Sequence, residues 1–248
     1  MSRAQAFFKS RSFTSMLSRR TAMGLGLAAA AAVGARAVAQ DDDAEKVKVP
    51  KYKPMGRGAP GGRIGGATRG TPPESLKMLA LAPDHVGYAA QAQPVLYWYL
   101  SDPIDGAVFT IKPADGSGAV MKKDLTGPLA KGVQAVSVAE LGISLEPEKV
   151  YEWSISLAAD QPKDISALSR GLVAVRAASS KVTKQAAKAK PEALPELYAE
   201  NGYWYDAIDG ISRLIAANPA VNSYKLIRAG MVEQVKLFDV ADFDRGVM

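Results

Sequence analysis

The chain has 248 residues, of which 31 are basic, 25 are acidic, one is histidine and none is cysteine. The lack of cysteine excludes disulfides, thiolate metal sites and cysteine nucleophiles, and a single histidine excludes a multi-histidine metal centre. Hydrophobic residues make up 48% of the chain, which is enough for a packed core, so we expect one or two globular domains.

Residues 1–39 have the composition of an export signal. They contain six basic residues and no acidic one, so the rest of the chain has 25 residues of each sign. A basic stretch ending at Arg19-Arg20 is followed by a short alanine-rich apolar segment and by Ala37-Val38-Ala39, an A-x-A cleavage pattern. The apolar segment is too short for a membrane span, so we expect no transmembrane span in the mature chain, which would begin at Gln40.

The paired arginines indicate the twin-arginine route of export, while the general secretory route stays open because its signals share the same three parts. Translation from Met16 instead of Met1 would leave a shorter leader with the same apolar segment. By either route and from either start, we expect a periplasmic or secreted bacterial protein.

Residues 40–70 form a polar, glycine-rich lead-in arm. Seven basic residues here face four acidic ones, and arginines recur every six positions at Arg57, Arg63 and Arg69. Glycine-rich backbone exposes amide groups to anions, so these arginines are candidates for contact with an anion or an acidic partner. The alternatives are an extended segment held on the rest of the protein by arginine–carboxylate pairs, and a segment without fixed structure.

Phosphate-binding motifs are not supported in this arm. Residues 56–61 match G-x-G-x-x-G, but a dinucleotide site requires a strand before the motif and a helix after it. Here a stretch with lysine and proline precedes the glycines and further glycines follow, and no Gly-Lys-Ser/Thr is present for a P-loop. No block of the mature chain is basic enough for a nucleic-acid domain. We therefore expect no cofactor and no nucleic-acid partner.

Residues 71–178 have the pattern of a β-domain. Alternating apolar and polar residues predict short strands separated by turns. The predicted strands span 95–100, 107–111, 119–123, 134–138, 150–157 and 172–177. The segment 119–123 is short and polar, which is typical of an edge strand. Strands at this spacing favour an antiparallel β-sandwich.

Tyr151 is expected to close a tyrosine corner. The segment from Leu145 to Tyr151 is similar to the corner of fibronectin-like and immunoglobulin-like sandwiches, in which the tyrosine hydroxyl bonds to the backbone just upstream. This likeness favours a sandwich over a barrel. With the helices that follow it, the fold class is α+β.

Two aromatic clusters are candidates for a binding surface. On a strand, Tyr97 and Tyr99 would share one face, and Tyr203 and Trp204 belong to the second cluster. Aromatic rings left exposed on such a face would offer a surface for carbohydrate or peptide. The alternative is that the C-terminal helices cover this face, with Trp204 packed against it.

The ionisable residues do not form a recognisable catalytic set. His85 stands in a predicted surface loop, without a nucleophile motif for it to serve. Two carboxylate pairs have spacings that suggest joint action, namely Asp102 with Asp105 and Asp206 with Asp209. The first pair lies in a turn, where aspartate bonds locally, and the second lies one helical turn apart, usually on a solvated face. We therefore expect neither catalytic residues nor a metal site.

The C-terminal part of the chain changes to a helical period. We interpret the lysine- and alanine-rich residues 179–190 as a linker, and residues 191–248 as a small helical domain. The expected helices end at Asn201-Gly202, at Asn218-Pro219 and at the close of the segment 224–238. Their pattern resembles a single tetratricopeptide unit, which cannot bury its own apolar face. We expect the unit to dock on the sandwich or on a partner.

Several of these segments also carry a family resemblance. The most specific are the glycine–arginine run at 56–70 and the sequence Tyr-Ala-Glu-Asn-Gly-Tyr-Trp-Tyr-Asp-Ala at 198–207, supported by 95–100 and 145–157. Over most of residues 56–238 the chain resembles the bacterial family known as domain of unknown function 928. The resemblance implies an exported protein, and it assigns no catalytic residue because the family has no established reaction.

The leading hypothesis is a non-enzymatic interaction module of the periplasm or envelope, with an envelope protein or a glycan as partner. The alternative is a carbohydrate-binding or carbohydrate-acting protein that uses exposed aromatic rings and carboxylates. A third hypothesis is a structural subunit of an envelope complex, whose arm inserts into a neighbour. The lack of a recognisable catalytic set favours binding, while the question of catalysis stays open.

Overall fold

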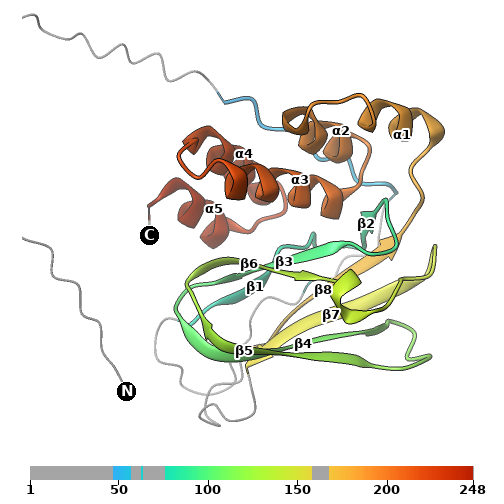
Figure 1. The fold of residues 1–248 in the computed structure, drawn as a ribbon, viewed down its shortest axis with the longest axis vertical. Helices are drawn as coiled ribbons and strands as arrows, with labels where there is room; N and C mark the ends of the chain where they lie inside the picture. The colour runs from blue at the N-terminus through green and yellow to red at the C-terminus, as the bar shows by residue number, and fades with distance from the viewer. Residues whose placement is uncertain (1–46, 57–62, 64–75, 158–167, 248) are drawn as a thin grey trace, which may run out of the picture. The chain divides into compact units, whose positions relative to one another are not determined.

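The computed structural model describes residues 47–56, 63, 76–157 and 168–247. In these residues eight strands come first and five α-helices follow, with short 3₁₀ helices at Ala139–Leu141 and Pro191–Ala193 (Figure 1). All of them belong to one compact unit, which agrees with the α+β fold class. The export signal predicted at 1–39 lies outside the described residues.

The strands form a three-stranded and a five-stranded sheet. In spatial order, the first sheet contains β1 (Met78–Ala80), β3 (Val95–Leu100) and β6 (Gly132–Ser137). The second contains β2 (Gly87–Ala89), β8 (Leu168–Val175), β7 (Val150–Leu157), β4 (Ile104–Pro113) and β5 (Met121–Leu129). The paired strands are antiparallel, except that β2 runs parallel to β8. The predicted sandwich of mostly antiparallel strands is thereby confirmed.

Strands β3 and β7 have the predicted bounds, and β5 lies at the edge of its sheet as its polar sequence predicts. Strands β4 and β5 are longer than predicted because they form a hairpin, in which Ile111 pairs with Met121 and each strand extends the other's ladder. Strands β1 and β2 are not among the predicted strands. Each has only three residues, which is too short for an alternating apolar–polar pattern to be recognised.

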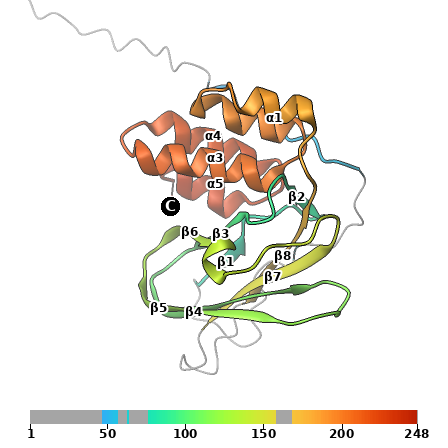
Figure 2. The same cartoon turned by 45° about the vertical axis from the view of Figure 1, so that its right-hand side comes forward.

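The three-stranded sheet is the middle layer of the fold, between the helices and the five-stranded sheet (Figures 1 and 2). Along β3, Tyr97 and Tyr99 contact the helices, since Tyr97 bonds to helix α3 and Tyr99 packs on helix α5. Leu96 and Trp98 alternate with them, face the opposite way and are fully buried. One hydrophobic cluster includes residues of both sheets and of the helices.

The five helices are α1 (Ser180–Ala186), α2 (Leu194–Glu200), α3 (Trp204–Ala217), α4 (Asn222–Glu233) and α5 (Phe238–Arg245). Helix α2 ends at the predicted stop, because Gly202 takes a left-handed φ of 82° that a helix cannot continue. The predicted stop of α3 at Asn218 is also confirmed. None of the helices in the described part of the chain is long and apolar enough to span a membrane.

Two parts of the helical prediction need correction. The third expected helix, 224–238, ends early: α4 stops at Glu233 and the chain turns at residues 234–237, where Lys236 has a φ of 60°. Helix α5 begins only at Phe238 and runs beyond the expected segment. Helix α1 lies inside the segment interpreted as a linker. It forms because the Ser179 side chain accepts a hydrogen bond from the Val182 amide, and Val182 is buried.

The tyrosine corner is confirmed. The Tyr151 hydroxyl accepts a hydrogen bond of 3.2 Å from the backbone amide of Glu146, five residues upstream. Its ring is buried at the start of β7, so this bond fixes the turn that leads into the strand. The alternation along β7 is also as predicted, with Trp153 and Ile155 buried on the same face as Tyr151.

The described segment 47–56 is bound to the helices, and the Gln234 side chain holds its backbone at two points. The Tyr52 amide donates to Gln234 Oε1 at 2.9 Å, and Gln234 Nε2 donates to the Pro50 carbonyl at 2.8 Å. A third bond, from the Lys53 amide, reaches the last turn of α2. This part of the lead-in is therefore an ordered component of the fold.

Candidate functional site

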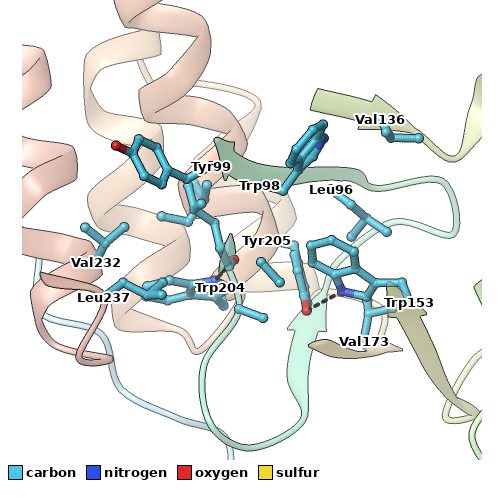
Figure 3. Packing of buried hydrophobic residues seen from close by; sticks show 14 of the residues in the cluster. Leu96, Trp98, Tyr99, Val136, Trp153, Val173, Trp204, Tyr205, Val232 and Leu237 are labelled. Atoms are coloured by element: carbon cyan, nitrogen blue, oxygen red, sulfur yellow. Dashed lines mark hydrogen bonds between the residues drawn. The ribbon is translucent and has the colours of Figure 1, made fainter. Parts of the chain in front are cut away.

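Four consecutive residues at the start of α3 each bond to a different part of the β layers, and Figure 3 shows two of them, Trp204 and Tyr205. Three donate to backbone carbonyls, and the fourth, a carboxylate, accepts from a backbone amide. The bonds run from Tyr203 to Ala177 at 3.3 Å, from Trp204 to Leu81 at 2.8 Å, from Tyr205 to Leu172 at 2.9 Å, and from the Ala90 amide to Asp206 at 2.8 Å. The Tyr205 hydroxyl also accepts from Trp153 Nε1 at 3.0 Å. This segment fixes the helices on the sheets.

Three of the four aromatic candidates are buried and provide no binding surface. Tyr99 and Trp204 have no exposed area, and Tyr203 is 4% exposed. The helices cover this face of the three-stranded sheet, which is the alternative that the sequence left open. Tyr97 keeps some exposure, and its hydroxyl donates to Asp209 at 2.9 Å. The expected exposed aromatic surface is therefore wrong for Tyr99, Tyr203 and Trp204.

Arg63 is a structural cation. Its Nη1 donates to the Ala82 carbonyl at 3.1 Å and to the Val235 carbonyl at 2.8 Å, and burial lowers its pKa. It joins the residues after β1 to the turn after α4, so the lead-in is held as expected, but by carbonyls and not by carboxylates. Arg57 and Arg69, the other arginines proposed for partner contact, lie outside the described residues.

His85 lies in the predicted loop, and its side chain is partly buried. Its ring stacks on Tyr52 at a centroid distance of 5.9 Å, and its Nε2 lies 3.1 Å from the Tyr52 hydroxyl. Its Nδ1 lies 3.1 Å from a carboxylate oxygen of Asp84. Burial raises the pKa of Tyr52, so its hydroxyl stays protonated near neutral pH. The group ties the lead-in to the loop between β1 and β2.

The two carboxylate pairs differ in their surroundings. Asp102 accepts a 2.8 Å bond from the adjacent Ser101 hydroxyl, which is the local bonding expected of a turn. Asp206 and Asp209 do not lie on a freely solvated face as expected. Burial raises the pKa of Asp206 from 3.8 to about 7. Asp209 accepts from Tyr97 and also, at both of its oxygens, from Nε of Arg213 at 2.9 and 2.8 Å.

Asp206 and Asp209 line a pocket of about 430 Å³, which we call the joint pocket. It lies where the loop between β2 and β3 meets helices α2 and α3. The other polar side chains that contribute to its lining include Gln91, Gln93, Tyr198 and Arg213. The bond from the Ala90 amide to Asp206 holds this loop against α3 and thereby sets the mouth of the pocket.

The joint pocket is polar with little net charge. The charges of Asp209 and Arg213 compensate each other, and Asp206 is partly protonated at neutral pH. Its volume is in the usual range for small-molecule sites, about 300–1,000 Å³. Glutamine amides supply both donors and acceptors, and the Tyr198 ring supplies an apolar face. No group of three or more His, Asp or Glu side chains that could hold a metal ion occurs among the described residues.

Pattern reading missed Gln91, Gln93 and Tyr198 as pocket residues. Gln91 and Gln93 lie in a loop whose role depends on a helix more than one hundred positions later in the chain. Tyr198 belongs to the family-specific segment, which was read as a helix end. The available signal was weak: two glutamines directly before the core strand β3.

Comparison with protein-family models gives a match that covers both the sheets and the pocket residues. A family model described as Domain of Unknown Function (DUF928) matches residues 64–244, which is well over half of the chain and includes both sheets and the joint pocket. No curated protein matches the chain. The matched range includes the segment 198–207, which contains the four residues that fix α3 to the sheets. On the extent of this match, the chain belongs to the DUF928 family.

Proposed function

We propose that this protein is exported across the bacterial cytoplasmic membrane and acts in the periplasm or envelope as a non-enzymatic binding module. The leader supports export: it has six basic residues, no acidic residue and an A-x-A pattern before Gln40. The joint pocket is the binding site in this proposal. Its partner is an envelope protein or a glycan that presents a polar, weakly charged group to the pocket.

The hydrogen bonds of the pocket carboxylates are the observation that carries this proposal. Hydrolysis of glycosides requires one carboxylic acid and one carboxylate free to attack the sugar or to activate water. Asp209 already accepts bonds from Arg213 and Tyr97, and Asp206 accepts one from the Ala90 amide. Because both oxygens of Asp209 are engaged, the described lining of the pocket offers no second free carboxylate beside Asp206, which favours binding over turnover.

A carbohydrate is the ligand class that the pocket lining favours. The ring of Tyr198 offers a flat apolar face to the C–H groups of a sugar, and Gln91 bonds to hydroxyl groups through its amide. The Gln93 Nε2 donates to the Ile143 carbonyl at 2.9 Å, so Gln93 offers its amide oxygen. This role uses an aromatic residue other than the four expected to be exposed. The carbohydrate-binding alternative is therefore retained, with the joint pocket as the binding site.

We further propose that α2 and α3 form the single tetratricopeptide-like unit of the family. The turn at Asn201-Gly202 and the apolar face of α3 support this assignment. In this proposal the apolar face of the unit packs on the three-stranded sheet, which takes the place that a second repeat has in a repeat array.

Export is tested by expressing the full chain in a bacterial host and fractionating the cells. We expect a periplasmic product whose N-terminus is Gln40, and retention in the cytoplasm when Arg19 and Arg20 are both replaced by lysine. An exported lysine variant would reject the twin-arginine route alone. A chain that keeps its leader and stays in the cytoplasm would reject export.

Binding is tested by titration calorimetry of the purified chain against a panel of neutral oligosaccharides. We expect Gln91→Ala to weaken binding about five- to tenfold, since it removes an amide that bonds the ligand. Gln185→Ala on helix α1, an exposed glutamine outside the pocket, is the matched control and should leave affinity unchanged. Shortening of the oligosaccharides during incubation would contradict a non-enzymatic role. Equal affinities for both variants would contradict the site.

A further inference from the structure

A second hollow lies between strand β6 and helices α3, α4 and α5. It has a volume of about 730 Å³, and we call it the basic groove. Its lining contains five basic side chains and one acidic side chain. They are Lys131, Arg213, Lys225, Arg228 and Arg245, against Asp244. Because the mature chain as a whole carries equal numbers of basic and acidic residues, this surplus is local to the groove.

The acidic side chain of the groove is already neutralised within the fold. Asp244 accepts bonds of 2.7 and 2.6 Å from Nε and Nη2 of Arg228, and both side chains are almost fully buried. Arg228 also donates to the Ser212 hydroxyl at 3.2 Å. This pair forms part of the wall of the groove and contributes no net charge to it.

The remaining four cations of the groove differ in whether they form an ion pair within the fold. Arg213 and Arg245 bond to Asp209 and Glu233, which are not part of the groove lining. Lys131 is exposed and Lys225 is half-buried. Neither lysine makes an ion pair with another residue in the described ranges. Both ammonium groups are therefore available to an anionic ligand.

The floor of the groove is apolar, and the strand that borders it is the last of its sheet. Val133, Ile215 and Phe243 are partly buried side chains that line it. In the described sheet, β6 pairs with β3 on one side only, so it is an edge strand. Edge strands present main-chain groups that pair with an added extended segment. The groove thus combines an apolar floor and a cationic rim with an edge strand along its border.

We propose that the basic groove binds an acidic, extended segment of a partner protein. Alternate side chains of such a segment would rest on the apolar floor, while its carboxylates lie near Lys131 and Lys225. Opposite charges on the two surfaces would speed association and select against basic partners. The groove and the joint pocket share only Arg213 in their linings, so this inference goes beyond the proposed function and does not depend on it.

The groove is a second candidate surface for an acidic partner, beside the arginines of the lead-in. Of those three candidates, Arg63 donates to two carbonyls and is partly buried, while Arg57 and Arg69 lie outside the described residues. The cations of the groove come from one strand boundary and three helices, which only the folded chain brings together.

The test is fluorescence anisotropy with a labelled peptide of alternating glutamate and leucine, added to the purified full chain. The variant carries Lys131→Glu and Lys225→Glu. The control carries Lys51→Glu and Lys122→Glu, which change the net charge equally at exposed positions outside the groove. We expect the groove variant to lose affinity about tenfold or more and the control to change by less than about twofold. Binding of the unaltered chain should weaken as salt increases.

Three results would overturn the proposal. The first is no saturable binding of the glutamate–leucine peptide, and the second is an equal loss of affinity in both variants. The third is equal binding of a lysine–leucine peptide. Anionic phospholipid vesicles form a separate arm: groove-dependent binding to vesicles without binding to the peptide would assign the groove to a membrane surface instead. Matched unfolding midpoints of both variants would show that folding is intact.

Discussion

Asp206 is a carboxyl group enclosed at the start of a helix, where it fixes a loop that belongs to another layer. Burial disfavours the charged form of Asp206 and raises its pKa, while the hydrogen bond from the Ala90 amide favours the charged form and lowers it. Burial has the larger effect, so the pKa rises to about 7. The helix N-terminus offsets only part of this effect. A single residue therefore makes the attachment of the β2–β3 loop sensitive to pH.

The stability of the fold should depend on pH through this residue. Between pH 4 and 7, approximately, the folded chain holds a proton on Asp206 that the unfolded chain releases. The free energy of unfolding should therefore fall as pH rises through this window, by at most about 1.4 kcal/mol per pH unit from this group. Asp206→Asn keeps an oxygen for the Ala90 amide but cannot ionise. Relative to the unaltered chain, it should gain stability as pH rises.

The measurement is urea unfolding at a series of pH values from 5 to 8, approximately, which spans the upper part of the window. Asp105→Asn, at an exposed position at the start of β4 and not in the turn expected from the sequence, serves as the control for loss of one carboxylate. Parallel stability curves for the Asp206→Asn variant and the unaltered chain would disprove the assigned role.

At the scale of elements, the Arg228–Asp244 pair holds the last three helices together. The two side chains come from α4 and α5, and the third partner, Ser212, comes from α3. Both charged groups are almost fully buried, with side-chain exposures of 7% and 1%. A buried pair of this kind adds little over an apolar pair, but removing one partner leaves an uncompensated charge.

Asp244→Ala should therefore destabilise the fold by about 3–5 kcal/mol, because it leaves the Arg228 guanidinium buried without a carboxylate. Glu233→Gln, which breaks the more exposed pair with Arg245, should cost less than about 1 kcal/mol. The double variant Arg228→Met, Asp244→Leu should recover most of the loss. Chemical denaturation measures all three, and equal costs for Asp244→Ala and Glu233→Gln would refute the argument.

At the scale of the whole molecule, the lead-in segment 47–56 packs across the helices and is bonded to α2 and to Gln234 after α4. Gly202 makes this crossing possible for two reasons. Its φ is 82°, and an added Cβ would lie 2.5 Å from Met55 Cγ and 2.9 Å from the Lys53 carbonyl oxygen. Gly202 therefore has two roles: it ends α2, and its lack of a side chain lets Lys53 and Met55 of the lead-in pack against it.

Gly202→Ala should therefore cost more than backbone strain alone. Gly142→Ala is a matched control, since its φ is 68° and nothing lies within 4 Å of the added Cβ. The control should cost about 1–2 kcal/mol from left-handed strain, and Gly202→Ala roughly 1–3 kcal/mol more from the clash. Hydrogen exchange should accelerate across residues 47–56 in the Gly202 variant. Unchanged exchange there would contradict the role of this contact.

Much of the fold was readable because its signals are local. The alternation in 150–157, the tyrosine corner at Tyr151 and the stop at Gly202 depend on neighbours within a few positions. The joint pocket was not readable in the same way. A loop glutamine such as Gln91 shows nothing of its role until Asp206 fixes the loop against α3. The exposed aromatic surface was wrong because burial of Tyr99 depends on helices far along the chain.

The sequence alone determined the class of fold, the bounds of β3 and β7, the stops of helices α2 and α3, and the family. These follow from short-range periodicity, from turn residues and from a matching motif. Only the tertiary structure decided which polar groups are buried, which cations are held by carbonyls, and where cations stay free. Those properties depend on burial and on partners from distant segments, as when Lys131 and Lys225 meet across one groove.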